Sequence, residues 1–145
     1  MSVREDIANN ILTTIQAISS PTIKKATRQP FPLDELSEQQ YPAVLIQTQL
    51  ETKADQELGS GGKTRINTLE FIITGYTKGA ESNIDTSRNE LAEAIENKLE
   101  EDITRNGNAL DTEVVEIETD AGELFPYGAI TMIVRVIYEH QSGTA

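Results

Sequence analysis

The stretch from Thr64 to Tyr76 constrains the fold more than any other, because it reads as one long strand that is apolar on both faces. One face carries Leu69, Phe71 and Ile73, and the opposite face is only partly polar, with Ile66, Ile72 and Tyr76. A strand of this kind belongs in the middle of a sheet. At a rise of about 3.3 Å per residue it spans roughly 40 Å, so we expect one end to project beyond the core.

Other segments supply the remaining strands. Ala43–Leu50 alternates with Val44, Ile46, Thr48 and Leu50 on its inner side, and Thr112–Thr119 alternates with Val115 and Ile117 inward. The last strand, Ala129–Glu139, is apolar on one face and interrupted by Ile133 and Ile137 on the other, which predicts a second central strand. The basic segment Thr22–Arg28 predicts a short edge strand, because lysine on an edge discourages unwanted pairing.

Two amphipathic helices are predicted. Ser2 and Glu5 have the spacing of a capping box, and the first helix ends at Ser19-Ser20-Pro21. Its apolar stripe is Val3, Ile7, Ile11, Ile15 and Ile18. The second helix begins at Ser82 or Asp85 and runs to about Asp102, with a stripe of Ile84, Leu91, Ile95, Leu99 and Ile103.

This order of elements predicts an α+β domain, because helices and strands do not alternate throughout. We expect a mostly antiparallel or mixed sheet, two amphipathic helices packed on one face, and a long projecting hairpin. The 145 residues suit a single domain, 1–145, with a flexible hairpin tip at about 51–63 and a frayed tail at about 140–145. The other face of the sheet carries Ile66, Ile72, Ile133 and Ile137, and we expect a protein partner to cover it.

Composition excludes several classes of protein. The chain has no cysteine, which rules out disulfides and thiolate metal sites. Because no apolar run reaches the ~20 residues that span a bilayer and the start is polar, we expect a soluble chain that is cytoplasmic where it is made.

The net charge of −12 is concentrated in one segment. Residues 81–123 hold fourteen acidic and three basic residues, a net of −11, whereas residues 1–80 hold nine and eight, a net of −1. Such a segment is either a solvated face or a surface that repels phosphate or meets a basic partner. In both cases a nucleic-acid-binding protein, whether it contacts phosphates or recognises a base sequence, is disfavoured, because such proteins need clustered Lys and Arg.

Two local motifs resemble ligand sites and lack the required context. Gly62-Lys63-Thr64 matches the end of a phosphate-binding loop, but Glu57 stands where the pattern needs glycine, and a strand follows instead of a helix. Asp102 to Glu113 partly matches an EF-hand loop, but Leu110 is apolar and a strand follows. The alternative for that loop is a turn in which Asn106-Gly107 adopts positive φ angles, and we assign no metal or cofactor.

Catalysis is not expected. The single histidine, His140, sits near the end of the chain, which argues against a triad or a histidine metal site within one chain. The glutamates of the second helix have the spacing of a solvated face, since acid–base pairs need burial and unequal environments. We therefore predict that the protein is not an enzyme.

The order of these elements, and several stretches within them, carry a family resemblance. They are the N-terminal helix, PFPLDELSEQQYPAVLIQT (Pro30 to Thr48), TLEFIITGYTKG (Thr68 to Gly79), NIDTSRNELAEAIENKL (Asn83 to Leu99) and VRVIYEH (Val134 to His140). Over nearly the whole chain this series resembles the tail terminator, or tail completion, proteins of long-tailed bacteriophages.

The resemblance implies a non-enzymatic virion protein without a cofactor, located in the tail or neck and assembled in the cytoplasm of the bacterial host. Such proteins form a homo-oligomeric ring, usually a hexamer, that caps the tail tube, ends its polymerisation and offers a docking face to the neck. DNA would pass through without sequence-specific binding, and no membrane is involved. Another head-to-tail joining protein, of the neck or head-completion kind, is the alternative.

We expect the partner interface to involve the hairpin and the turn before the last strand. The residues are Gly59, Gly61, Lys63, Arg65, Asn67, Phe125 and Tyr127. The polar residues after the glycine-rich tip are too polar for a core and predict the stem of the projecting hairpin. Removing Gln56 to Gly62 should spare folding and weaken tube capping.

Overall fold

The computed structural model describes residues 2–32, 36–55, 64–79, 82–120 and 126–141. The elements in chain order are α1 (Val3–Gln16), β1 (Lys25–Thr27), the short 3-10 helix η2 (Glu38–Gln40), β2 (Ala43–Asp55), β3 (Thr64–Lys78), α2 (Ile84–Glu100), β4 (Asp111–Thr119) and β5 (Tyr127–Gln141). Within the described ranges, no helix has both the length and the apolar character needed to cross a membrane.

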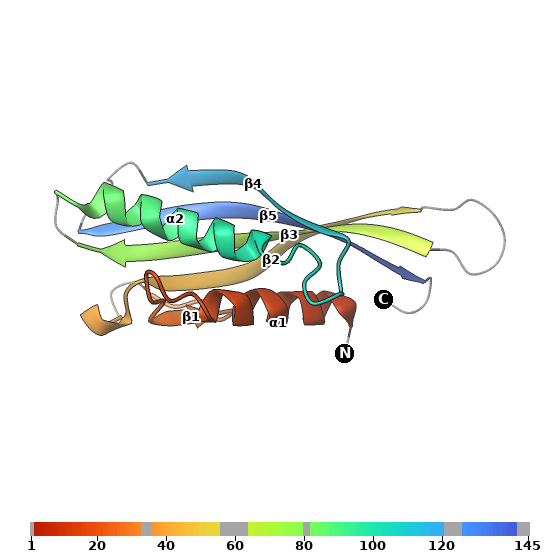
Figure 1. The fold of residues 1–145 in the computed structure, drawn as a ribbon, viewed down its shortest axis with the longest axis horizontal. Helices are drawn as coiled ribbons and strands as arrows, with labels where there is room; N and C mark the ends of the chain where they lie inside the picture. Colours follow the sequence, from red (N-terminus) through yellow and green to blue (C-terminus); the bar gives the residue numbers. More distant parts are fainter. Residues whose placement is uncertain (1, 33–35, 56–63, 80–81, 121–125, 142–145) are drawn as a thin grey trace.

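The five strands form one mixed sheet in the order β1-β2-β3-β5-β4 (Figure 1). β1 pairs with β2 in parallel, and the other neighbours are antiparallel. The α+β class, the central positions of β3 and β5, and the basic edge strand β1 are confirmed. β5 continues through His140 to Gln141, so the described part of the expected frayed tail belongs to the sheet.

Both helices contribute to one hydrophobic core with a single face of the sheet. Ser2 caps α1 by accepting a hydrogen bond from the Glu5 amide, and Ile7, Ile11 and Ile15 are fully buried. α2 adds Leu91, Ile95, Leu99 and Ala92 to the same core cluster. In Figure 1 the two helices lie side by side in front of the sheet, with α2 over β3 and β5 and α1 towards β1.

Alternation along the central strands builds the inner face. Phe71 pairs with Val134 and Ile73 with Met132, and all four side chains are fully buried. Gly75 lets the helix approach β3 closely, because a Cβ atom there would lie 2.8 Å from Leu91 Cδ2.

A bulge in β2 changes which residues face inward. Val44 and Ile46 are buried as expected, but the register shifts between Thr48 and Leu50. Leu50 therefore lies opposite Glu70 and is 52% exposed, so its predicted inward position is wrong. Thr48 precedes the shift and lies opposite the buried Phe71, but its side chain is exposed. The same shift places Glu51 opposite the buried Leu69.

A second bulge changes β4. The register shifts between Val114 and Glu116, and the expected inward residues Val115 and Ile117 are 36% and 41% exposed. Thr112 is the buried residue of this edge strand. The predicted burial of Ile103 is also wrong, since this side chain lies beyond the end of α2 and is 42% exposed.

The loop between α2 and β4 is held by its own hydrogen bonds. The Asp102 carboxylate accepts from the amides of Thr104 and Asn106, and positive φ angles occur at Arg105, Asn106 and Gly107. The Arg105 guanidinium is fully buried and donates to the carbonyls of Leu99 and Asp102, so it satisfies the end of α2. This geometry agrees with a turn, and the described residues contain no group of three potential metal-binding side chains.

Candidate functional site

The far end of the β2–β3 hairpin is the first candidate surface. β2 and β3 remain paired out to Asp55 opposite Arg65, and β5 joins them as far as Gln141. Figure 1 shows these strand ends extending beyond the ends of both helices. We refer to the paired residues 51–55, 65–69 and 136–140 as the stem.

A polar network ties the base of the stem to α1. The two Glu51 carboxylate oxygens accept from Arg4 Nε at 2.6 Å and Arg4 Nη2 at 2.8 Å, a bidentate pair. Glu51 also lies 2.6 Å from Lys53 Nζ and accepts from the Tyr138 hydroxyl at 3.0 Å. Its side chain is only 13% exposed. The network therefore joins α1, β2 and β5 at one carboxylate.

Charge stabilises the ionised form of Glu51. The hydrogen bonds from Arg4, with further contributions from Lys53 and Tyr138, lower the pKa of Glu51 to about 2 against the opposing effect of burial. The same pair raises the pKa of Arg4 above its ordinary value. Burial, followed by the bond to Glu51, raises the pKa of Tyr138. At neutral pH the network therefore holds fixed charges and one neutral hydroxyl.

Asn67 lies inside the stem, where the sequence predicted a side chain too polar for the core. That expectation is wrong, because Asn67 is fully buried. Its Oδ1 accepts from Lys53 Nζ at 3.0 Å, which orients Nδ2 towards His140 Nδ1 at 2.7 Å. In this contact Nδ2 of Asn67 can only donate, so the hydrogen bond runs from Asn67 to His140. Burial is possible because both ends of the amide have partners.

The other predicted interface residues fall into two groups. Arg65 lies half-buried at the outer end of the stem, opposite Asp55 and His140. Gly59, Gly61, Lys63 and Phe125 lie outside the described residues, so the structure does not test their predicted role.

Tyr127 lies at the other end of the sheet. It pairs with Lys78, whose ammonium group stands 5.5 Å from the Tyr127 ring centre, and its ring lies 5.6 Å from that of Tyr41. Thirteen residues of β3 separate Lys78 from Arg65, roughly 40 Å along the strand. The predicted interface residues that the structure describes therefore lie towards opposite ends of β3, Arg65 and Asn67 at one end and Tyr127 at the other.

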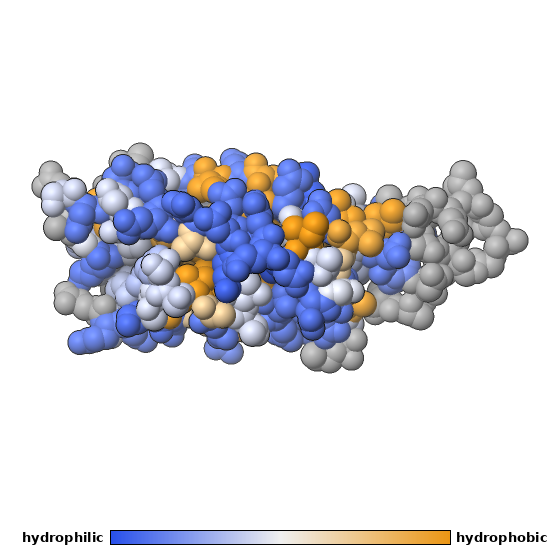
Figure 2. All heavy atoms as spheres, in the orientation of Figure 1, coloured by the Kyte–Doolittle hydropathy of each residue, from blue (hydrophilic) through white to orange (hydrophobic). Residues whose placement is uncertain are grey.

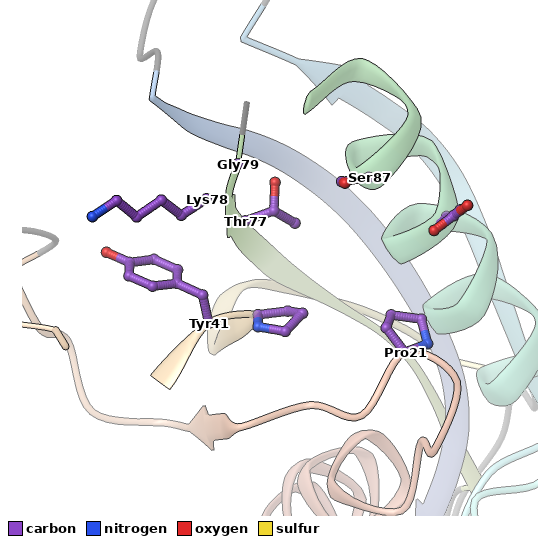
Figure 3. Close-up of a pocket in the computed structure, with 8 residues that line it drawn as sticks. Pro21, Tyr41, Thr77, Lys78, Gly79 and Ser87 are labelled. Atoms are coloured by element: carbon purple, nitrogen blue, oxygen red, sulfur yellow. The ribbon is translucent and has the colours of Figure 1, made fainter. Parts of the chain in front are cut away.

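An open hollow of about 570 Å³ adjoins the Tyr127 end (Figure 3). Its lining residues are Pro21, Tyr41, Pro42, Thr77, Lys78, Gly79, Ser87 and Glu90. The amino end of Lys78 and the hydroxyl end of Tyr41 point away from Pro21 in Figure 3. Thr77 is 5% exposed, and its hydroxyl has no hydrogen-bond partner in the described part of the chain.

A buried arginine supports this end and was not anticipated from the sequence. Arg88 of α2 pairs with Asp120 after β4 and with Asp85 at 2.8 Å. Its side chain is 7% exposed and fills the space beside Gly128, where a Cβ atom would lie 2.7 Å from Arg88 Cγ. The hydrogen bonds that Arg88 donates to the Asp85 and Asp120 carboxylates raise the pKa of Arg88. Only the fold reveals this site, since its partners are 3 and 32 residues away.

The face of the sheet opposite the helices is partly apolar, as expected. Ile72 and Ile133 are cross-strand neighbours, Ile137 lies on the same face, and all three are half-buried. Glu70 and Arg135 form the next pair between them. The two long helices pack on the other face, so the described helices leave this row accessible.

The described residues offer three contact surfaces. The stem combines a polar network with the buried Leu69, Val136 and Tyr138, the outer face is partly apolar, and the hollow is lined by hydroxyl groups, Lys78 and Glu90. In the described ranges His140 bonds to Asn67 and lies in the stem, far from the hollow, so no nucleophile there has a histidine base.

Comparison with solved structures gives a likeness of low strength. No family model matches the chain, and no curated protein matches its sequence. Among solved structures, a chain in "Virion of native gene transfer agent (GTA) particle" aligns with a TM-score of 0.45 and 11% identity. The alignment covers 90% of this chain and 92% of that chain. A score of this size is too low to assign a shared fold.

Proposed function

We propose that this protein is a structural component of a phage-type virion that acts as a tail terminator. In this role several copies form a closed ring, a hexamer by the family resemblance. The ring caps the end of the tail tube, stops its polymerisation and presents a docking face to the neck. The proposal rests on the resemblance of the sequence over nearly the whole chain and on the two-ended arrangement of contact surfaces. It requires no cofactor and no catalytic residue.

The stem is the single observation that carries the proposal. A two-stranded projection normally bends and frays, because it lacks a core. Here a third strand, β5, accompanies it, and the Glu51 network anchors its base to α1. Such a stem holds its outer end at a fixed position relative to the body. That property suits an element that must reach the tube or a neighbouring subunit in one geometry.

The two ends of the sheet suit two different partners. We assign the stem end, with Arg65, to the tail tube or the adjacent copy. We assign the Tyr127 end, with the hollow beside it, to the neck. A protein that closes one polymer and receives another assembly needs two separate faces, and a distance of roughly 40 Å along β3 separates these two.

The acidic surface fits a ring through which DNA passes. Several cations already form ion pairs within the chain: Arg4 and Lys53 with Glu51, Arg28 with Glu5, and Arg88 with Asp120. Exposed carboxylates remain on α2 and β4. A negative lumen repels phosphate, so DNA would pass without sequence-specific binding. The protein would then be found in the tail or neck after assembly in the bacterial cytoplasm.

Electron microscopy of the purified protein, alone and with polymerising tail tube protein, tests the proposal. We expect closed six-fold rings and tubes with one capped end. A protein that stays monomeric at high concentration in the presence of tubes contradicts it. Rings that bind a portal assembly but do not bind tail tubes would instead identify a neck or head-completion component.

A further inference from the structure

The two edges of the sheet carry opposite charges. β4 forms one edge, and its exposed glutamates are Glu113, Glu116 and Glu118. β1 forms the other edge. The exposed Lys24 precedes this strand, and Lys25 is its first residue. The Lys25 ammonium group lies 5.5 Å from the centre of the Phe31 ring. Lys24 makes no ion pair with any residue that the structure describes. A protein with net charge −12 thus keeps a basic edge.

Both edges also offer apolar contact and accessible backbone. Val115 and Ile117 of β4 are 36% and 41% exposed, and Figure 2 shows a hydrophobic strip over β4 at the upper margin of the view. On the opposite edge, Ile23 and Ala26 lie at the rim of the core and are half-buried. The Ala26 carbonyl there accepts a long, exposed bond of 3.4 Å from Gln16. A backbone amide of a neighbouring strand can replace Gln16 as the donor to this carbonyl.

Strand directions permit the two edges to pair. β1 runs parallel to β2, and the three following steps across the sheet are antiparallel. β4 therefore runs opposite to β1. A second copy with its helices on the same side can place its β1 beside β4 as an antiparallel neighbour, the pairing with the more favourable hydrogen-bond geometry.

Charge distinguishes this arrangement from a two-fold dimer. Pairing two β4 edges would set three glutamates against three glutamates, and like charges directly opposite are destabilising. Pairing β4 with β1 sets glutamates near lysines. Because the contacting surfaces differ, the contact is heterologous, the kind of contact that builds a ring when the rotation between copies closes.

We propose that the β4 edge of each copy docks on the β1 edge of the next copy, so that the five-stranded sheets join around the ring. The inference rests on the proposed ring function and names the contact that builds it. Glu116 and Glu118 on one side and Lys24 and Lys25 on the other provide the charge complementarity. Val115 and Ile117 provide the apolar surface that becomes buried.

Reciprocal charge reversal tests the contact. One variant carries Lys24→Glu and Lys25→Glu, and a second carries Glu116→Lys and Glu118→Lys. We expect each alone to weaken ring formation about 100-fold or more, because like charges then meet at every contact. An equimolar mixture of the two variants, and a single chain that carries all four changes, should both form rings again.

The matched control is Glu93→Lys with Glu100→Lys, two exposed residues of α2. This control makes the same change in net charge as the β4 variant and should leave assembly unchanged. Circular dichroism and thermal melting confirm that each variant folds. Sedimentation velocity and negative-stain images give the assembly state.

The possible failures are distinguishable. If the wild-type protein forms rings and neither reversal weakens them, the edge contact is wrong while the ring function stands. If the β4 reversal strengthens a dimer that the β1 reversal leaves unchanged, the copies contact through β4 alone and the inference is overturned. If the wild-type protein forms no ring with or without tail tubes, the proposed function fails and the edge contact fails with it.

Discussion

The two ends of β3 are held by different interactions. Towards the body, Phe71 and Ile73 are buried in the hydrophobic core, where apolar contacts stabilise the strand. Towards the stem, Asn67 and its neighbours are held by ion pairs and hydrogen bonds centred on Glu51. Apolar burial depends little on pH, whereas a charged network responds to it directly. The stem can therefore be weakened without unfolding the body.

Phe71→Ala should have the largest effect on stability. It removes a fully buried ring at the centre of the sheet, and we expect the free energy of unfolding to fall by about 3–5 kcal/mol. Urea denaturation measures this loss. Thr68→Ala, three residues away on the partly exposed face, should change stability by less than about 1 kcal/mol. Equal losses in the two variants would contradict the assignment of the core to one face.

Glu51→Ala should have a smaller effect that is confined to the stem. It leaves Arg4, Lys53 and the Tyr138 hydroxyl without their shared acceptor, and we expect a loss of about 2–3 kcal/mol. Hydrogen exchange should show faster exchange of stem amides while the amides of Phe71 and Ile73 stay protected. Tyr138→Phe, which removes one donor, should cost about 1 kcal/mol. Uniform loosening of the whole sheet would argue against a separate stem.

The pH dependence should reveal the same carboxylate. The pKa of Glu51 is about 2 in the folded protein and 4.5 in the ordinary state, so its ionised form is favoured by folding. The contribution of ionised Glu51 to the free energy of unfolding is complete above about pH 4.5 and is lost as the pH falls towards 2. Glu51→Gln should therefore lose less stability than wild type across that window, by about 2 kcal/mol. If the free energy of unfolding falls equally with pH in the two proteins, the ionised form of Glu51 is not stabilised by its partners.

The predictions from sequence succeed where hydrophobic periodicity alone determines which residues of a helix or strand face the core. Hydrophobic spacing located α1, α2, β3 and β5, and their inward faces agree with the structure. It failed at Leu50, because a bulge before this residue reverses the alternation that follows, and at Val115, which is itself the extra residue of a bulge. No local pattern marks these bulges, since strand propensity is the same on either side of them.

The candidate surfaces were predicted less completely. The contacts expected at the hairpin and at Tyr127 stay predictions. The network of Arg4, Glu51 and Tyr138 was not predicted, because it joins residues 47 and 87 positions apart. Such a site becomes visible only when strand register is known. Asn67 was misjudged for the same reason, because its hydrogen-bond partners come from two other strands.

The length of tail tubes tests the central claim most directly. Replacing residues 56–64 by Asn-Gly closes the Asp55–Arg65 pair with a two-residue hairpin turn and leaves the Glu51 network intact. We expect this variant to melt within a few degrees of wild type and to leave tubes uncapped, so that tubes grow longer and vary more in length. Tubes of wild-type length with the shortened hairpin would contradict the claim that the end of this hairpin carries the contact that ends the tail.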